Sequence, residues 1–112
     1  MNNYSQINNQ IFIGDFNSNK IWDYKRSEGD HSSCVRLLKN KNIVSLYHQH
    51  MNELQGEEQT PTFYLQRNIT KPYHIDYAFI PSHLLPEASL SIGSHHEWLE
   101  ISDHMPLIVE IP

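Results

Sequence analysis

The spacing of hydrophobic and polar residues along the chain predicts mainly short strands. Residues 10 to 14 predict a short buried strand around the apolar run Ile11-Phe12-Ile13. The stretches "TFYLQ" (62–66) and "YHIDYAFI" (73–80) are rich in β-branched and aromatic residues, and residues 68 to 72 between them resemble a hairpin connection. In "LIVEI" (107–111) one face is fully apolar, so we expect a last strand there.

One segment, residues 33 to 41, has helical spacing. It places four side chains on one predicted face: Cys34, Val35, Leu37 and Leu38. Asp30 or Ser32 is a candidate N-cap for this helix. We expect Cys34, beside Val35, to be a small buried thiol.

The remaining segments complete an order of strand, helix and then mostly strands. "NIVSLYH" (42–48) predicts a strand, and two polar segments, 18–31 and 48–61, are expected to be loops. The C-terminal third holds three weaker signals: a helical turn at 82–85, a strand at 88–92, and a loop or single turn at 95–101. This order predicts an α+β layered architecture.

Length and composition limit the classes of protein. The 112 residues allow a single domain, 1–112, with a flexible polar N-terminus at residues 1–9. The net charge of -5 and a total of eight Lys and Arg residues disfavour non-specific binding of a long duplex. One cysteine excludes an internal disulfide and a Cys-based zinc site. We expect a cytoplasmic protein with no membrane span, because no long apolar stretch or secretory signal is present.

Polar residues interrupt the apolar pattern at strand boundaries. Asp15 and Asn17 directly follow the first predicted strand, either as a turn or as side chains that share a sheet edge. Asp76 lies in a strand that is apolar on both faces, so its carboxylate is expected to be buried and to need a donor. That donor is a backbone amide, a Tyr hydroxyl or an imidazole.

A candidate imidazole precedes the last strand. Asp103 and His104 stand just before the apolar residues that begin at Leu107. If this strand lies near the one that carries Asp76, the carboxylate can fix the tautomer of His104 and stabilise its protonated form. Asp103 would then face the same pocket and could bind a hard cation.

Three motifs in this order resemble a known family. "GDFN" (14–17), "IDYAF" (75–79) and "SDHMPL" (102–107) are similar to the C-terminal half of the endonuclease/exonuclease/phosphatase superfamily, which has the DNase-I-like fold. The resemblance covers nearly the whole chain from about residue 10 onward. It implies half of a four-layer α/β sandwich, with a mostly antiparallel mixed sheet and one or two helices.

The resemblance also implies roles for individual residues. Asp15 would polarise or deprotonate the attacking water, and Asn17 would orient this water and the phosphate. Asp76 would support His104, which would contact the phosphate and stabilise its developing charge. Asp15 and Asp103 would be the two acids that bind the metal ion. Two aromatic residues would lie against the substrate: Phe63 and Tyr64.

The implied function is metal-dependent hydrolysis of a phosphoester, either in nucleic acid or in another phosphodiester. The upstream half of the family's domain supplies the main metal-binding Glu, and no acid precedes Ile11 here. We therefore expect Mg²⁺ or Mn²⁺ to bind weakly or not at all, and the chain alone to be inactive. A homodimer or a separate N-terminal half would cover the exposed sheet face. The alternative is a non-catalytic binding or dimerisation module with the same fold.

Overall fold

The computed structural model describes residues 10–25 and 30–112, so the flexible terminus expected at residues 1–9 lies outside the described residues. The elements follow in the order β1 (Phe12–Asp15), η2 (Lys20–Lys25), α1 (His31–Asn40), β2 (Ile43–Ser45), α2 (Leu46–Met51), β3 (Phe63–Tyr64), η3 (Leu65–Arg67), β4 (Pro72–Tyr73), β5 (Asp76–Pro81), η4 (Ser82–Glu87), β6 (Ser89–Ile92), α3 (His95–Trp98) and β7 (Leu107–Glu110), where η denotes a 3₁₀ helix. The predicted α+β class is confirmed.

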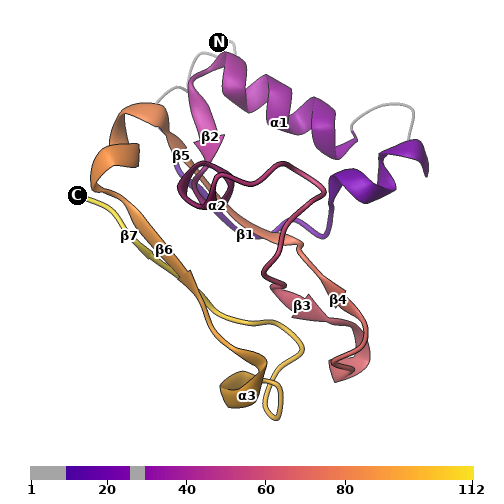
Figure 1. Cartoon of the computed structure of the whole chain (residues 1–112). Helices are drawn as coiled ribbons and strands as arrows, with labels where there is room; N and C mark the ends of the chain where they lie inside the picture. Colours follow the sequence, from indigo (N-terminus) through magenta and orange to yellow (C-terminus); the bar gives the residue numbers. More distant parts are fainter. Residues whose placement is uncertain (1–9, 26–29) are drawn as a thin grey trace.

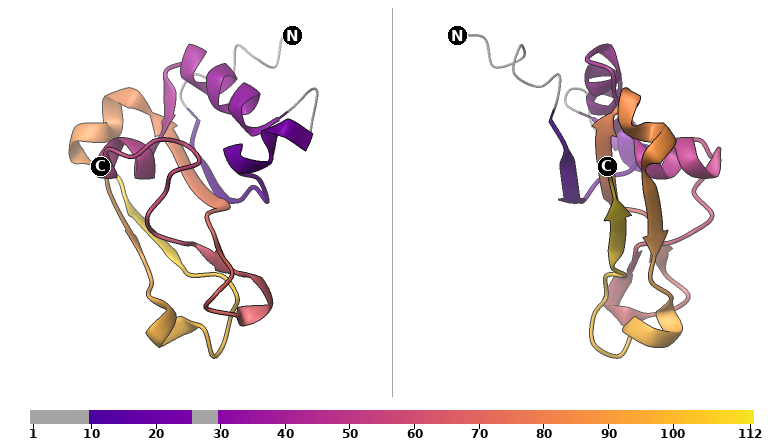
Figure 2. Two further views of the ribbon diagram at one scale, coloured as in Figure 1. Left: turned by 45° about the vertical axis from the view of Figure 1, so that its right-hand side comes forward. Right: turned by 90° about the vertical axis from the view of Figure 1, so that its left-hand side faces the viewer.

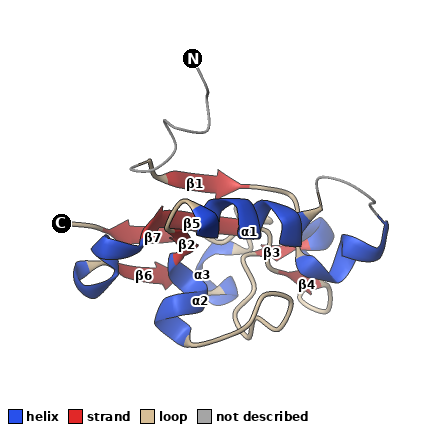
Figure 3. Cartoon of the chain, turned by 90° about the horizontal axis from the view of Figure 1, so that it is seen from above, coloured by secondary structure: helices blue, strands red, loops and turns tan. Residues whose placement is uncertain are grey.

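In the described part of the chain, the strands form three small antiparallel sheets. A three-stranded sheet has the order β1-β5-β2, and β3 pairs with β4 and β6 with β7. In Figure 1, α1 lies at one end of the molecule, while the β3–β4 hairpin and α3 lie at the opposite end. The same separation is visible in both views of Figure 2. Seen from above, β1 lies at one edge of the molecule (Figure 3).

The central strand β5 divides the core into two clusters. Tyr77 and Phe79 pack with Leu38 of α1 and with Ile43 of β2. The intervening residues of β5 point to the other face, where Leu46 of α2 is buried among apolar residues of η4, β6 and β7. Because each face of β5 is covered, the strand is apolar on both faces from Tyr77 onward.

Helix α1 confirms one predicted cap and corrects the predicted buried face. Asp30 is the N-cap, and its Oδ1 accepts a hydrogen bond of 2.8 Å from the backbone N–H of Ser33. Val35 and Leu38 pack into the core, one helical turn apart. Cys34 is exposed, so the prediction of a buried thiol is wrong. The helix contacts the sheet through a narrower stripe than the sequence indicated.

The structure also corrects the boundaries of several elements. The strand predicted at 42–48 ends at Ser45, whose side chain accepts from the backbone N–H of His48 and caps α2. Helix η2 lies within the loop predicted at 18–31, and α2 occupies the start of the one predicted at 48–61. The strand predicted at 62–66 is shorter, because local hydrogen bonds turn the chain after Tyr64, and the strand predicted at 73–80 is divided between β4 and β5. Within residues 10–25 and 30–112, no helix has both the length and the apolar character needed to cross a membrane.

Candidate functional site

The candidate site begins where β1 and β5 pair at their polar ends. Asp15, the last residue of β1, lies directly opposite Asp76, the first residue of β5. Side chains of a directly opposed pair lie on the same face of a sheet, so the two carboxylates are neighbours. Gly14 precedes this pair with a φ of +149°, a conformation that residues with a side chain rarely adopt. Glycine therefore allows the strand to deliver Asp15 to the sheet edge.

The chain turns sharply after Asp15. The backbone N–H of Asn17 donates a hydrogen bond of 2.7 Å to Oδ1 of Asp15, and Asn17 has a left-handed φ of 49°. The sequence left two interpretations of Asp15 open, a turn and a shared sheet edge, and the structure contains both. Asn17 does not continue the extended backbone, because the carboxylate captures its N–H.

His104 joins the two carboxylates. Its Nδ1 lies 2.9 Å from Oδ2 and 3.1 Å from Oδ1 of Asp76. Because a carboxylate accepts hydrogen bonds, this contact places a proton on Nδ1 and turns Nε2 outward. Nε2 lies 3.7 Å from Oδ2 of Asp15. A water oxygen about 2.8 Å from both Nε2 and Oδ2 would complete a triangle with them, and the water could donate a hydrogen bond to the carboxylate.

Solvent exposure of the side chains increases from Asp76 through His104 to Asp15. The side chain of Asp76 is 12% exposed, that of His104 33% and that of Asp15 48%. Burial raises the pKa of Asp76 above its usual 3.8, and the hydrogen bonds from His104 and from the Thr62 hydroxyl oppose this rise. Asp76 is thus the enclosed support of the imidazole, and Asp15 faces solvent.

The same three residues are a candidate metal centre. Asp15, Asp76 and His104 each offer one ligand atom, and these atoms lie within 4.8 Å of one another. Both oxygens of Asp76 already contact Nδ1 of His104, whereas Oδ2 of Asp15 lies outside that contact. Carboxylate oxygens suit a hard cation that keeps several waters. The three residues are therefore a candidate site for a hard cation, and Asp15 is the residue whose oxygen is most available to it.

The other residues singled out in the sequence lie around this group. The ring of Phe63 lies 4.8 Å from that of His104, between ring centroids. Tyr64 is buried, and its backbone N–H donates to the carbonyl of Asp103. Asp103 does not belong to the metal-ligand group of Asp15, Asp76 and His104. The structure therefore brings Phe63 to the imidazole and holds Asp103 through its backbone.

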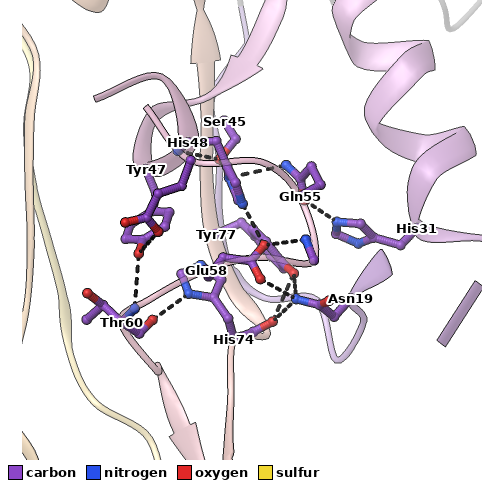
Figure 4. A network of polar contacts seen from close by, with 12 residues as sticks. Asn19, His31, Ser45, Tyr47, His48, Gln55, Glu58, Thr60, His74 and Tyr77 are labelled. Carbon is purple, nitrogen blue, oxygen red and sulfur yellow. Dashed lines mark hydrogen bonds and ion pairs between the residues drawn. The ribbon is translucent and has the colours of Figure 1, made fainter. Parts of the chain in front are cut away.

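A second polar cluster lies across the sheet and was not predicted (Figure 4). Its centre is the Glu58 carboxylate, which accepts hydrogen bonds of 2.6 Å from Nε2 of His48 and 3.1 Å from Nδ2 of Asn19. Asn19 also donates to the carbonyl of His74 and to the hydroxyl of Tyr77. The cluster thereby ties the loop after β1 to β5 and to the segment after α2.

The charge of Glu58 depends on these contacts. Burial raises the pKa of Glu58, but the hydrogen bonds from His48, Asn19 and the Gly56 N–H outweigh burial and lower it to about 2. His74 lies beside this cluster, and burial lowers the pKa of its imidazole. Its Nε2 is buried without a hydrogen-bond partner among the described residues. A sequence signal for this cluster is weak, because Glu58 stands in a polar segment without hydrophobic periodicity.

Comparison of the chain with protein-family models, with curated proteins and with solved structures finds no match. The case for a function therefore rests on the contacts within the chain.

Proposed function

We propose that Asp15, Asp76 and His104 form part of the catalytic site of a metal-dependent phosphoester hydrolase. The observation that carries this proposal is the arrangement of His104, with Nδ1 2.9 Å from the buried Asp76 and Nε2 3.7 Å from the exposed Asp15. A carboxylate behind an imidazole fixes its tautomer and stabilises its positive charge. The motifs that carry these residues also resemble those of the endonuclease/exonuclease/phosphatase superfamily.

Each residue has a distinct role in the proposed reaction. Asp15 polarises the attacking water or takes its proton, because its Oδ2 is exposed and close to the imidazole. Protonated His104 donates through Nε2 to a phosphate oxygen and stabilises the developing charge. Asp76 holds the ring throughout. The Phe63 ring beside His104 limits the directions from which a substrate can approach.

Mg²⁺ or Mn²⁺ would withdraw charge from the phosphate when bound. Asp15 is the residue best placed to hold it, since both oxygens of Asp76 contact the imidazole. One carboxylate and waters give weak binding, and a second acidic ligand from elsewhere would strengthen it. This fits a chain that represents the C-terminal half of a four-layer sandwich. The remaining ligand would then come from a complementing N-terminal half or from a second copy.

Hydrolysis of a chromogenic phosphodiester tests the proposal. The rate would be measured at high protein concentration with Mg²⁺, with a chelator, and for His104→Ala. The sequence led us to expect an inactive chain, but Asp15 is exposed and lies beside Nε2 of His104, so we now expect a weak Mg²⁺-dependent rate. This rate should fall about a hundredfold in His104→Ala, because the variant loses the group that neutralises the phosphate. His83→Ala is the matched control, because His83 is an exposed histidine on η4, outside the site.

Equal rates for the chain with Mg²⁺, with chelator and in His104→Ala would contradict the catalytic function. That result would favour the alternative, a binding or dimerisation module. A loss of activity in His83→Ala as large as that in His104→Ala would also contradict it, because the effect would then not depend on the site.

A further inference from the structure

Thr62 is a fully buried polar residue whose backbone and side chain are all engaged. Its exposed fraction is 0%. Its backbone N–H donates a hydrogen bond of 2.9 Å to the carbonyl of Tyr73, and its own carbonyl accepts a hydrogen bond of 2.7 Å from the N–H of Met105. Its hydroxyl oxygen accepts from two successive backbone amides, Ile75 at 3.0 Å and Asp76 at 3.1 Å. One residue thus contacts both segments that supply the imidazole and its supporting carboxylate.

The contacts of Thr62 hold Asp76 from its backbone side. A hydroxyl oxygen has two lone pairs, and the amides of Ile75 and Asp76 occupy both. Its hydrogen then remains for the Asp76 carboxyl, whose pKa the hydrogen bond from the Thr62 hydroxyl lowers. Without the hydroxyl, two buried amides would lose their acceptor at the point where β5 begins. The hydroxyl therefore fixes the backbone from which the Asp76 side chain projects.

The same segment holds His104 through three consecutive contacts. The Thr62 carbonyl binds the N–H of Met105, which directly follows His104. Phe63 forms an isolated antiparallel β-bridge with His104. The N–H of Tyr64 donates 2.8 Å to the carbonyl of Asp103, which directly precedes His104. In Figure 1 the loop between α3 and β7 accordingly passes beside β3.

We propose that Thr62 is a positioning residue that sets the distance between Asp76 and His104, by its hydroxyl on one side and its carbonyl on the other. Thr62 does not contact the exposed side of the group, so it acts through these two residues. The catalytic consequence of this role rests on the proposed function, whereas the geometric consequence does not.

Two variants of Thr62 separate the effect of its hydroxyl from the effect of its bulk. Thr62→Val keeps the shape and removes the hydroxyl, and Thr62→Ser keeps the hydroxyl and removes the methyl group. Ser45→Ala is the matched control, because it removes another buried hydroxyl, one that contacts Nδ1 of His48 on the opposite face of the sheet. The geometric measurement is the NMR resonance of the proton on Nδ1 of the His104 ring. This resonance is visible while the proton is hydrogen-bonded to Asp76, because it then exchanges slowly with water.

We expect this resonance in the wild type, in Thr62→Ser and in Ser45→Ala, and its loss in Thr62→Val. Where Mg²⁺-dependent hydrolysis is measurable, kcat of Thr62→Val falls about tenfold or more with KM little changed, and Thr62→Ser retains most of kcat. This split is expected because the hydroxyl orients the reacting group and does not bind substrate.

An unchanged ring resonance in Thr62→Val would overturn the proposal, as would an equal loss in Ser45→Ala. Thr62→Ser decides the question even where Thr62→Val does not fold. This variant keeps the hydroxyl, so loss of the His104 ring resonance in Thr62→Ser would overturn the proposed role of Thr62. Retention of the resonance in Thr62→Ser supports that role. If the wild type hydrolyses no phosphodiester, only the proposed function is contradicted. The His104 ring resonance in the Thr62 variants still decides the role of Thr62.

Discussion

At the scale of single residues, one step along β5 separates two polar clusters. Asp76 faces the candidate site, and Tyr77 faces the cluster around Glu58, because successive side chains of a strand point to opposite faces. Asn19 contacts the hydroxyl of Tyr77 and lies four residues after Asp15. The Glu58 cluster therefore supports the loop that follows one carboxylate of the site and the strand that carries the other.

The residues of the candidate site were more predictable than those of the Glu58 cluster. Asp15, Asp76 and His104 each interrupt an apolar segment or border one, so the sequence itself marks them. The partners of Glu58 lie up to 39 residues away, and nothing in the local pattern indicates that they meet. Thr62 gave no signal either, because its proposed role depends on backbone groups of two other segments, residues 73–76 and Met105.

Replacement of Glu58 predicts a pH-dependent loss of stability. The pKa of Glu58 is lowered from 4.5 to about 2 in the folded chain. A lowered pKa stabilises the fold above the unfolded value, and this contribution disappears as the pH falls from about 4.5 towards 2. Glu58→Gln should therefore lower the free energy of unfolding at neutral pH by on the order of 3 kcal/mol, with a smaller difference from the wild type near pH 2.

Urea denaturation at several pH values measures this difference, and Glu57→Gln is the control, because Glu57 is an exposed neighbour. A deficit in Glu58→Gln that stays constant from neutral pH to pH 2 would show that the charge of Glu58 does not contribute.

At the scale of elements, hydrophobic periodicity predicted several strands better than the caps, turns and short helices between them. The strands predicted near residues 10–14, 88–92 and 107–111 are present as β1, β6 and β7. The sequence did not indicate that Ser45 ends β2 and caps α2, because Leu46 and Tyr47 continue the apolar pattern there. A side-chain cap overrode local propensity at this point.

Close packing between two elements predicts the effect of a single methyl group at Gly93. A Cβ on this residue would lie 2.6 Å from Cδ of Pro106 and 2.7 Å from Cδ1 of Trp98. Gly93 also donates its N–H to the carbonyl of Pro106, so the two backbones cannot separate freely. Gly93→Ala should lower the free energy of unfolding by about 1–3 kcal/mol through overpacking.

Thermal unfolding of Gly93→Ala and Ser94→Ala provides the measurement. Ser94 is exposed and its side chain makes no capping hydrogen bond to α3, so its replacement should change stability by less than about 0.5 kcal/mol. Equal stability of the two variants would show that the chain relaxes around the added methyl group.

At the scale of the whole molecule, β1 is the edge strand beside the candidate site within residues 10–25 and 30–112. Among the described residues β1 pairs only with β5, and it lies at the edge of the molecule in Figure 3. Ile13 is 51% exposed, on the same face of this strand as Asp15. An open edge with exposed apolar side chains is a template for another strand. A second copy offers the same edge, and two antiparallel β1 strands related by a twofold axis would pair with each other.

We therefore predict that the chain forms a homodimer through β1, and that Ile13→Lys makes it monomeric at micromolar concentration. The lysine places a charge in the new interface, and charged residues on an edge strand oppose pairing. Sedimentation velocity measures the state of the wild type, of Ile13→Lys and of the control Ile101→Lys, whose residue is 72% exposed in the loop between α3 and β7. A monomeric wild type would contradict this pairing, and so would a dimer that Ile13→Lys leaves intact.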